Sequence, residues 1–267
     1  MNAKPTQTDA QNDVLFDLAD GIATLTLNRA ARYNTLTSDV IATLSARLAE
    51  IGDNHEVRVV IIAATGKAFS TGHDLKEMNV NRDETFYRHL LAACSRMMQA
   101  IVVLPQPVIA QVQGIATAAG CQLVASCDLA LAARSARFAT NGIQNGLYCA
   151  TPSVALSRVV ARKHALEMLL TGDFIDAERA AEIGLINHVV DDADLATATR
   201  ALAGRIADKS QFAVRLGKAS FYRQVDQGLD SAYRGTSEEL VCNLLARDGI
   251  EGLNAFIEKR PPHWQNS

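Results

Sequence analysis

The sequence predicts an α/β protein with a helical C-terminal part. Through the first two-thirds of the chain, β-type apolar runs, turns and helical patterns follow one another in that order, and such alternation is typical of layered α/β folds. From about residue 192 onward the pattern is almost entirely helical. The length of 267 residues suits one large domain, or one domain with an appended subdomain.

The first expected elements are a hairpin and an amphipathic helix. Asp20-Gly21 separates two short β-prone runs, which predicts a β-hairpin. Apolar residues then recur at helical spacing over residues 35–51. Thr37 or Ser38 can cap this helix, because either hydroxyl can accept from a backbone N–H of the first turn.

The middle of the chain continues the alternation. We expect a buried strand over residues 57–65, a turn that enters a helix over 67–78 and a helix over 83–103. A strand over 107–112, a helix over 118–127 and a strand over 128–133 should follow. The strands are continuous apolar runs, which is typical of strands that are covered on both faces.

Three segments follow from this organisation. We expect a flexible N-terminal arm over residues 1–12, a folded core over 13–207, and a C-terminal helical region over 208–267. The arm is polar and has no apolar segment of the kind found in secretory signal peptides. The border is expected at residues 207–210, where the helical pattern breaks.

Composition and charge argue against several classes of function. The chain is 48% hydrophobic and 21% charged with a net charge of −3, so it has no basic field to attract nucleic acid. No apolar run approaches the roughly 18 residues that a membrane-spanning helix needs. The five cysteines form no CxxC pair and no metal-finger spacing, which favours reduced thiols in the cytoplasm and no metal site.

Two glycine-containing turns follow successive interior strands, at residues 69–75 and 114–120. Neither matches the dinucleotide or P-loop pattern. Each could be a close-packing turn, because glycine is the default residue wherever the chain turns tightly. Two such turns at the ends of neighbouring strands can also aim two backbone N–H groups at one point, which is how an oxyanion hole is built.

Five ordered stretches resemble the enoyl-CoA hydratase/isomerase (crotonase) family. They are "GIATLTLNRAARYNTL", "VVIIAATGKAFSTGHDLKEM", "PVIAQVQGIATAAGCQLVASCDLALA", "ALEMLLTGDFIDAERAAEIGLINHVV" and "EGLNAFIEKRPPHW". The resemblance implies a spiral of β-β-α turns and a C-terminal helical region that forms trimers or dimers of trimers. It also implies an acyl-coenzyme A thioester as substrate, with no separate cofactor.

By position in these motifs, the resemblance implies that the backbone N–H groups of His73 and Ala119 bind the thioester carbonyl. Ser70, Gly72 and Gly120 belong to the same two turns and are also expected to be part of the substrate-binding site. The family more often has glycine where Ala119 stands, but alanine keeps the N–H group. Removing one donor from such a hole typically costs about 2.7–4 kcal/mol.

The acids of the family are missing from the matching positions. Hydratases of this family use two glutamates to position a water and exchange its protons, and Gln122 and Gly142 stand at those two positions. A third position, used by some members for an aspartate, falls near Ala150. Glutamine cannot transfer a proton at neutral pH. The chain therefore resembles most closely the enoyl-CoA hydratase domain-containing proteins that lack both glutamates.

Several side chains are candidates for the rest of the site. His73 is considered as a replacement acid or base, since a histidine pKa near 6.5 suits proton transfer. Tyr148 and Cys149 follow Gly142, and we expect them to line the acyl pocket, where an apolar wall is the simpler role for Cys149. Asp74 is also placed at the substrate site, with a mainly structural function.

Basic residues at motif positions suggest the coenzyme A site. Arg29, Arg32 and Lys76 match positions near the nucleotide end, and Lys259, with Phe256, lies in the motif that reaches a neighbouring subunit's ligand. Such side chains suit phosphates, although each alone could be a solvated surface charge.

Two functions from different classes remain open at this stage. One is an enzyme acting on a 2-enoyl-CoA or related thioester through the oxyanion hole. The other is a non-catalytic protein that binds or sequesters acyl-CoA.

Overall fold

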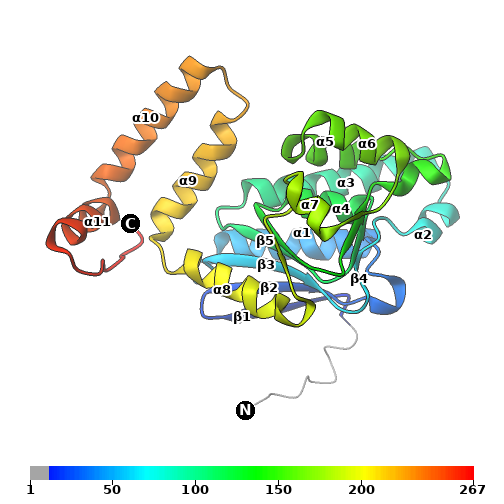
Figure 1. Cartoon of the computed structure of the whole chain (residues 1–267), viewed down its shortest axis with the longest axis horizontal. Coiled ribbons are helices and arrows are strands. Elements are labelled where there is room, and N and C mark those ends of the chain that lie inside the picture. Colours follow the sequence, from blue (N-terminus) through cyan, green and yellow to red (C-terminus); the bar gives the residue numbers. More distant parts are fainter. Residues whose placement is uncertain (1–11) are drawn as a thin grey trace, which may run out of the picture.

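The computed structural model describes residues 12–267 (Figure 1). The predicted N-terminal arm lies almost wholly outside these residues. The strands of the described part form two sheets, and helices pack around them (Figure 1).

The larger sheet has six strands in the order β1-β2-β3-β5-β7-β10. Their bounds are Val14–Ala19, Ile22–Leu27, Val59–Ala64, Val108–Val112, Leu129–Ala133 and His188–Val190. Asp20 and Gly21 both have positive φ, 55° and 74°, and β1 and β2 pair antiparallel on either side of them. The predicted hairpin is confirmed, and its two-residue turn has the φ signs that match strand twist.

The smaller sheet explains the spiral. It contains β4 (Ala68–Ser70), β6 (Ile115–Thr117), β8 (Arg137–Ala139) and β9 (Ile175–Asp176) in that order. Each unit β3–β4, β5–β6 and β7–β8 adds one strand to each sheet before the chain enters a helix. The spiral of β-β-α turns is thus confirmed. Residues 68–70, read from the sequence as part of a turn, form a strand too short to show a period of two.

The core contains the helices expected over residues 35–51, 83–103 and 118–127, the short helix expected within 67–78, and three further helices after residue 149 that are not predicted from the sequence. Their bounds are Ser38–Asp53 (α1), Leu75–Val80 (α2), Glu84–Val103 (α3), Ala119–Ser126 (α4), Ala150–Val159 (α5), Arg162–Thr171 (α6) and Ala177–Glu182 (α7). Thr37, rather than Ser38, caps α1, since its Oγ1 accepts from the Val40 N–H at 3.3 Å. All of α4 is buried, so this helix is the central element of the core.

The C-terminal third divides between the core and a projecting part. Helix α8 (Leu195–Ala207) packs on the larger sheet, where it shares a buried apolar cluster with β3, β5 and β7. Helices α9 (Gln211–Gln224), α10 (Leu229–Leu245) and α11 (Arg247–Glu258) extend away from the body (Figure 1). The helical pattern breaks between Ala207 and Gln211, as expected.

A buried ion pair ties α9 to the core. Lys218 of α9 donates to Asp128 Oδ2 at 2.6 Å, and only 7% of the lysine side chain is exposed. Lys218 also donates to the carbonyls of Ile101 and Gln106 at 2.9 and 3.0 Å. Tyr222, one turn later, donates to Asp128 Oδ1 at 2.8 Å. Lys218 and Tyr222, both in the second half of α9, therefore fix this helix to the start of β7.

Candidate active site

The two glycine-containing turns lie against each other. Strands β4 and β6 pair in parallel, so their carboxyl ends, from which the two turns leave, meet at one edge of the smaller sheet. Gly72 has φ +85°, and a Cβ there would lie 2.9 Å from the Ala119 nitrogen and 3.1 Å from Ala118 Cβ. Only glycine fits at position 72, because both the backbone angle and the contact exclude a side chain.

Two backbone donors are left free at this contact. Within residues 12–267, no hydrogen bond is donated by the N–H of His73 or by that of Ala119. Ala119 is the first residue of α4, where helix geometry leaves the N–H without an intrahelical partner. Both residues line a pocket of about 930 Å³. Free donors at a helix start can stabilise negative charge on a bound oxygen.

Buried polar contacts hold the first turn in place. Asn34 is 1% exposed and donates to the carbonyls of Thr65 and Ala68 at 2.8 and 2.7 Å. Ser70 Oγ donates to the Asn34 carbonyl at 2.8 Å and accepts from the Gly72 N–H at 3.2 Å. Ser70 is therefore a support for the turn and does not line the pocket.

The imidazole of His73 is buried beside the turn. Neither ring nitrogen has a hydrogen-bond partner among the described residues, and both are inaccessible to solvent. Burial lowers the pKa of His73, and the nearby Leu36 carbonyl and Glu77 carboxylate oppose this without reversing it. The ring is neutral at pH 7. Its nitrogens are shielded, so the backbone N–H is the group that His73 presents to the pocket.

The lowered His73 pKa predicts a loss of stability on acidification. The unfolded chain takes up a proton near pH 6.5, whereas the folded chain does so only at lower pH. Stability should therefore fall as the pH drops from about 6.5 towards the folded-state pKa. The free energy of unfolding, measured in urea at several pH values, should fall less steeply in His73→Leu. His89→Leu, which changes an exposed histidine, should keep the wild-type slope, and equal slopes in all three proteins would contradict this prediction.

Gln122 stands one helical turn after Ala119 on α4. It is 5% exposed, and no described residue donates to its Oε1. Gln122 does not itself line the pocket. A carboxamide at this position can accept or donate a hydrogen bond but cannot exchange a proton.

Gly142 lines the pocket, but the space a side chain would need is filled. A Cβ at Gly142 would lie 2.5 Å from the Leu147 carbonyl oxygen and 2.9 Å from Cys149 Sγ. The Gly142 carbonyl in turn accepts from the Leu147 N–H at 3.0 Å. A carboxylate cannot be added here without moving residues 147–149.

We expect Gly142→Ala to destabilise the fold by about 1–3 kcal/mol, because the new methyl group overlaps backbone atoms. Urea unfolding measures the effect. Gly146→Asn is the matched control: Gly146 has φ +73° and no heavy atom within 4 Å of its Cβ position, and asparagine tolerates that backbone region. A decrease in the free energy of unfolding of Gly146→Asn as large as that of Gly142→Ala would contradict the steric explanation.

Tyr148 and Cys149 line the pocket with apolar neighbours. Burial raises the pKa of the Cys149 thiol, while a contact with the Gly142 backbone acts in the opposite direction. A thiol with a raised pKa is a poor nucleophile at neutral pH. This agrees with a role as part of the pocket wall.

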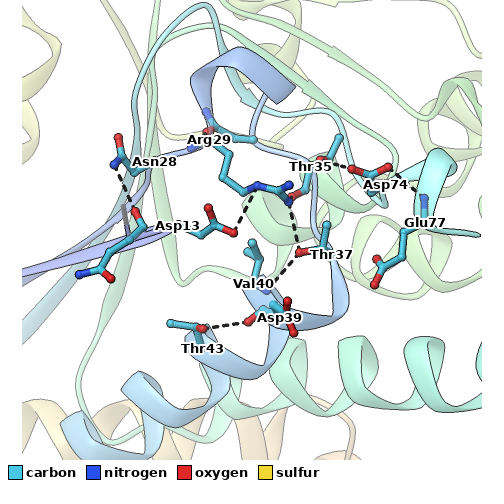
Figure 2. Close-up of polar contacts among 12 residues, drawn as sticks. Asp13, Asn28, Arg29, Thr35, Thr37, Asp39, Val40, Thr43, Asp74 and Glu77 are labelled. Carbon is cyan, nitrogen blue, oxygen red and sulfur yellow. Dashed lines mark hydrogen bonds and ion pairs between the residues drawn. The ribbon is translucent and has the colours of Figure 1, made fainter. Parts of the chain in front are cut away.

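The Asp74 side chain caps the N-terminus of α2. Its Oδ1 accepts from the N–H groups of Lys76 and Glu77 at 2.9 and 3.2 Å. Its Oδ2 accepts from Thr35 Oγ1 at 3.0 Å, and Figure 2 shows the bonds to Thr35 and Glu77. Burial raises the Asp74 pKa, but these bonds outweigh it and leave the net pKa below the usual value. The carboxylate lines the pocket but is held as a helix cap.

The basic candidates separate into two groups. Arg32 and Lys76 line the pocket. Arg29 does not: its guanidinium pairs with Asp13 at 3.3 Å and donates to Thr37 Oγ1 at 3.2 Å (Figure 2). Arg29 thus holds the loop before α1.

Phe256 and Lys259 belong to the far end of the molecule. Both lie at the end of α11, which is at the side opposite α2 (Figure 1). Phe256 is 84% exposed. The two residues are not brought to the pocket of their own chain.

Other pocket residues were not identified from the sequence. Leu91 of α3 and Phe174, just before β9, line the apolar part of the pocket, but both read as ordinary packing residues. Ala118 also lines it, with φ 48°, and nothing in the sequence marks an alanine for positive φ. Residues 12–267 contain no group of three metal-binding side chains and no helix suited to crossing a membrane.

Known proteins resemble the chain over nearly its whole length. The human enoyl-CoA hydratase domain-containing protein 3, mitochondrial, is 45% identical over 247 residues, covering 92% of this chain and 82% of that protein. The crotonyl-CoA hydratase of Syntrophomonas wolfei is 31% identical over 256 residues, covering 94% and 97%. A crystal structure of an enoyl-CoA hydratase from Mycobacterium smegmatis superposes with a TM-score of 0.94 at 47% identity, covering 95% of this chain and 99% of that one.

These matches confirm the resemblance found in the motifs, including the likeness to enoyl-CoA hydratase domain-containing proteins. They extend across the spiral, the two turns and the C-terminal helices. Since residues 17–267 match the sequence profile described as enoyl-CoA hydratase/isomerase, the chain belongs to the enoyl-CoA hydratase/isomerase family.

Proposed function

We propose that this protein binds an acyl-CoA thioester, with the thioester carbonyl between the N–H groups of His73 and Ala119. The observation that carries the proposal is the contact between the two turns, which leaves both donors free beside one pocket. The pocket walls are largely apolar, as a site for an acyl chain requires. The substrate class is a 2-enoyl-CoA or a related thioester.

The coenzyme A part would lie towards Arg32 and Lys76. These are the basic side chains that line the pocket, and cations suit the phosphates of the nucleotide. Arg29 is occupied by Asp13 and Thr37 and contributes only through the loop that carries Arg32.

The protein would act as a homotrimer or a dimer of trimers. Helices α9–α11 expose large apolar side chains, among them Leu229, Tyr233, Phe256 and Ile257, and contiguous exposed apolar surface is typical of interfaces. A neighbouring copy could then bring Phe256 and Lys259 to the pocket. Sedimentation equilibrium would test this, and a monomer at micromolar concentration would contradict it.

Ordinary hydratase activity is not expected. Hydration needs groups that exchange protons with the attacking water, whereas Gln122 and Gly142 offer none. The pocket carboxylate, Asp74, is held by three hydrogen bonds, and the nitrogens of His73 are shielded. These observations favour a second candidate function, non-catalytic binding or sequestration of acyl-CoA.

One experiment separates the candidates. Purified protein is titrated calorimetrically with crotonyl-CoA, and loss of the enoyl absorbance is followed in parallel. Binding without turnover supports the non-catalytic role, turnover supports an enzyme with another proton path, and no binding contradicts both. Lys76→Glu should weaken binding, whereas Arg205→Glu, which reverses an exposed charge on α8 away from the pocket, should not.

The cellular location is proposed to be the cytoplasm. The human relative is named as mitochondrial, so the mitochondrion is the alternative compartment to test. Microscopy of the chain carrying a C-terminal fluorescent tag would decide between the two compartments.

A further inference from the structure

Ala118 has a backbone conformation that alanine rarely adopts. Its φ is 48° and its ψ is −119°. Other residues with positive φ, such as Tyr33 and Lys259, have ψ of 31° and 40° and lie in the ordinary left-handed region. The ψ of Ala118 lies far outside that region, where only glycine is free of steric conflict.

The surrounding structure holds this conformation from both sides. The Ala118 N–H donates to the Ala139 carbonyl of β8 at 3.0 Å, and the Ala118 carbonyl accepts from the Gln122 N–H at 3.0 Å. Gly72 lies against its methyl group. Strained residues of this kind persist only where neighbours fix them, and they gather at functional sites.

The methyl group of Ala118 lies at the pocket wall next to the free donor. Ala118 is partly exposed and lines the pocket, whereas residues 116–117 and 119–126 are buried. Its Cβ is three bonds from the Ala119 nitrogen, so the two atoms are at most about 4 Å apart. If a thioester carbonyl accepts from that N–H with its α-carbon, rather than its sulfur, on the side of Ala118, the α-carbon lies close to this methyl group.

We propose that the Ala118 methyl group is a specificity-determining element that selects acyl groups without a substituent on the α-carbon. This inference rests on the proposed acyl-CoA binding. A branch at the α-carbon would compete with the methyl group for the space beside the oxyanion hole. Glycine at position 118 would relieve the backbone conflict and also open that space.

The test compares two ligands in three proteins. Wild type, Ala118→Gly and Ala31→Gly are titrated calorimetrically with crotonyl-CoA and with its 2-methyl derivative. Ala31 also lines the pocket but lies in a 3₁₀ turn far along the chain from the two donors, so its variant controls for the loss of a methyl group. The preference of wild type for the unbranched ligand should fall by about tenfold or more in Ala118→Gly, in line with the discrimination that one carbon provides.

Stability gives a second readout. The melting temperature of Ala118→Gly should be no lower than that of wild type, because glycine accepts this φ and ψ, whereas Ala31→Gly should melt lower. An unchanged ligand preference in Ala118→Gly, together with normal binding of crotonyl-CoA, would overturn only the specificity inference. Failure of wild type to bind either ligand would overturn the proposed function as well.

Discussion

Replacement of Asp128 by alanine is expected to destabilise the protein by about 3–5 kcal/mol, because it leaves Lys218 buried without a counter-charge. Asp128 accepts from Lys218 Nζ at 2.6 Å, from the Val108 N–H at 2.6 Å and from Tyr222 at 2.8 Å. Burial raises the pKa of Asp128 and lowers that of Lys218, in each case against the attraction of the partner. Urea unfolding at one fixed protein concentration measures the loss, since association would make stability depend on concentration.

Two further variants test the reason for this loss. Asp230→Ala removes an exposed pair with Arg234 at 3.1 Å and should change stability by less than about 1 kcal/mol. The double variant Asp128→Ala/Lys218→Met should recover much of the loss, because it removes the unpaired charge along with its partner. A single variant no less stable than Asp230→Ala would show that the pair does not anchor α9.

Replacement of Gly120 by alanine is the second change with a large expected effect. A Cβ at Gly120 would lie 2.0 Å from the Ser70 carbonyl oxygen and 2.7 Å from its carbon. Strand β4 and helix α4 must then move apart, at a cost of about 1–3 kcal/mol or more. The same movement separates His73 from Ala119, so acyl-CoA binding should be lost even in the fraction that folds. Unfolding in urea and calorimetric titration measure the two effects.

The control for Gly120 is a glycine with free space. Gly204 in α8 has no heavy atom within 4 Å of its Cβ position. Gly204→Ala should stabilise the protein by about 0.5–1 kcal/mol, because alanine is the better helix former, and should leave binding unchanged. If Gly120→Ala folded and bound like this control, the close approach of β4 and α4 would be contradicted.

Local patterns were sufficient for the elements with a strong period or a strong turn signal. The Asp20-Gly21 hairpin, the apolar stripe of α1 and the helix over residues 84–103 all follow from neighbouring residues. The strands of the smaller sheet do not, because two or three residues show no alternation and their pairing partners lie far along the chain. The family motifs, rather than periodicity, predicted the spiral.

At the candidate site, the sequence shows which residue types are present, whereas the fold shows which of them are in contact. The absence of carboxylates at positions 122 and 142 is visible in the sequence alone. That Gly142 faces the Leu147 carbonyl and Cys149, and that Arg29 is held by Asp13, depends on contacts between distant segments. The burial of the His73 ring nitrogens also depends on such contacts. Because these nitrogens are shielded, only the backbone N–H of His73 can act in the pocket.

The sequence by itself determined the family, the two turns and the lack of a carboxylate at positions 122 and 142, because these are properties of residue types in a fixed order. Only the tertiary structure decided which groups meet. Parallel pairing of β4 with β6 brings Gly72 against Ala119, and the backbone around Ala118 is held in a conformation that its own side chain disfavours. Such contacts arise from the packing of strands and helices that are dozens of residues apart, and no local pattern encodes them.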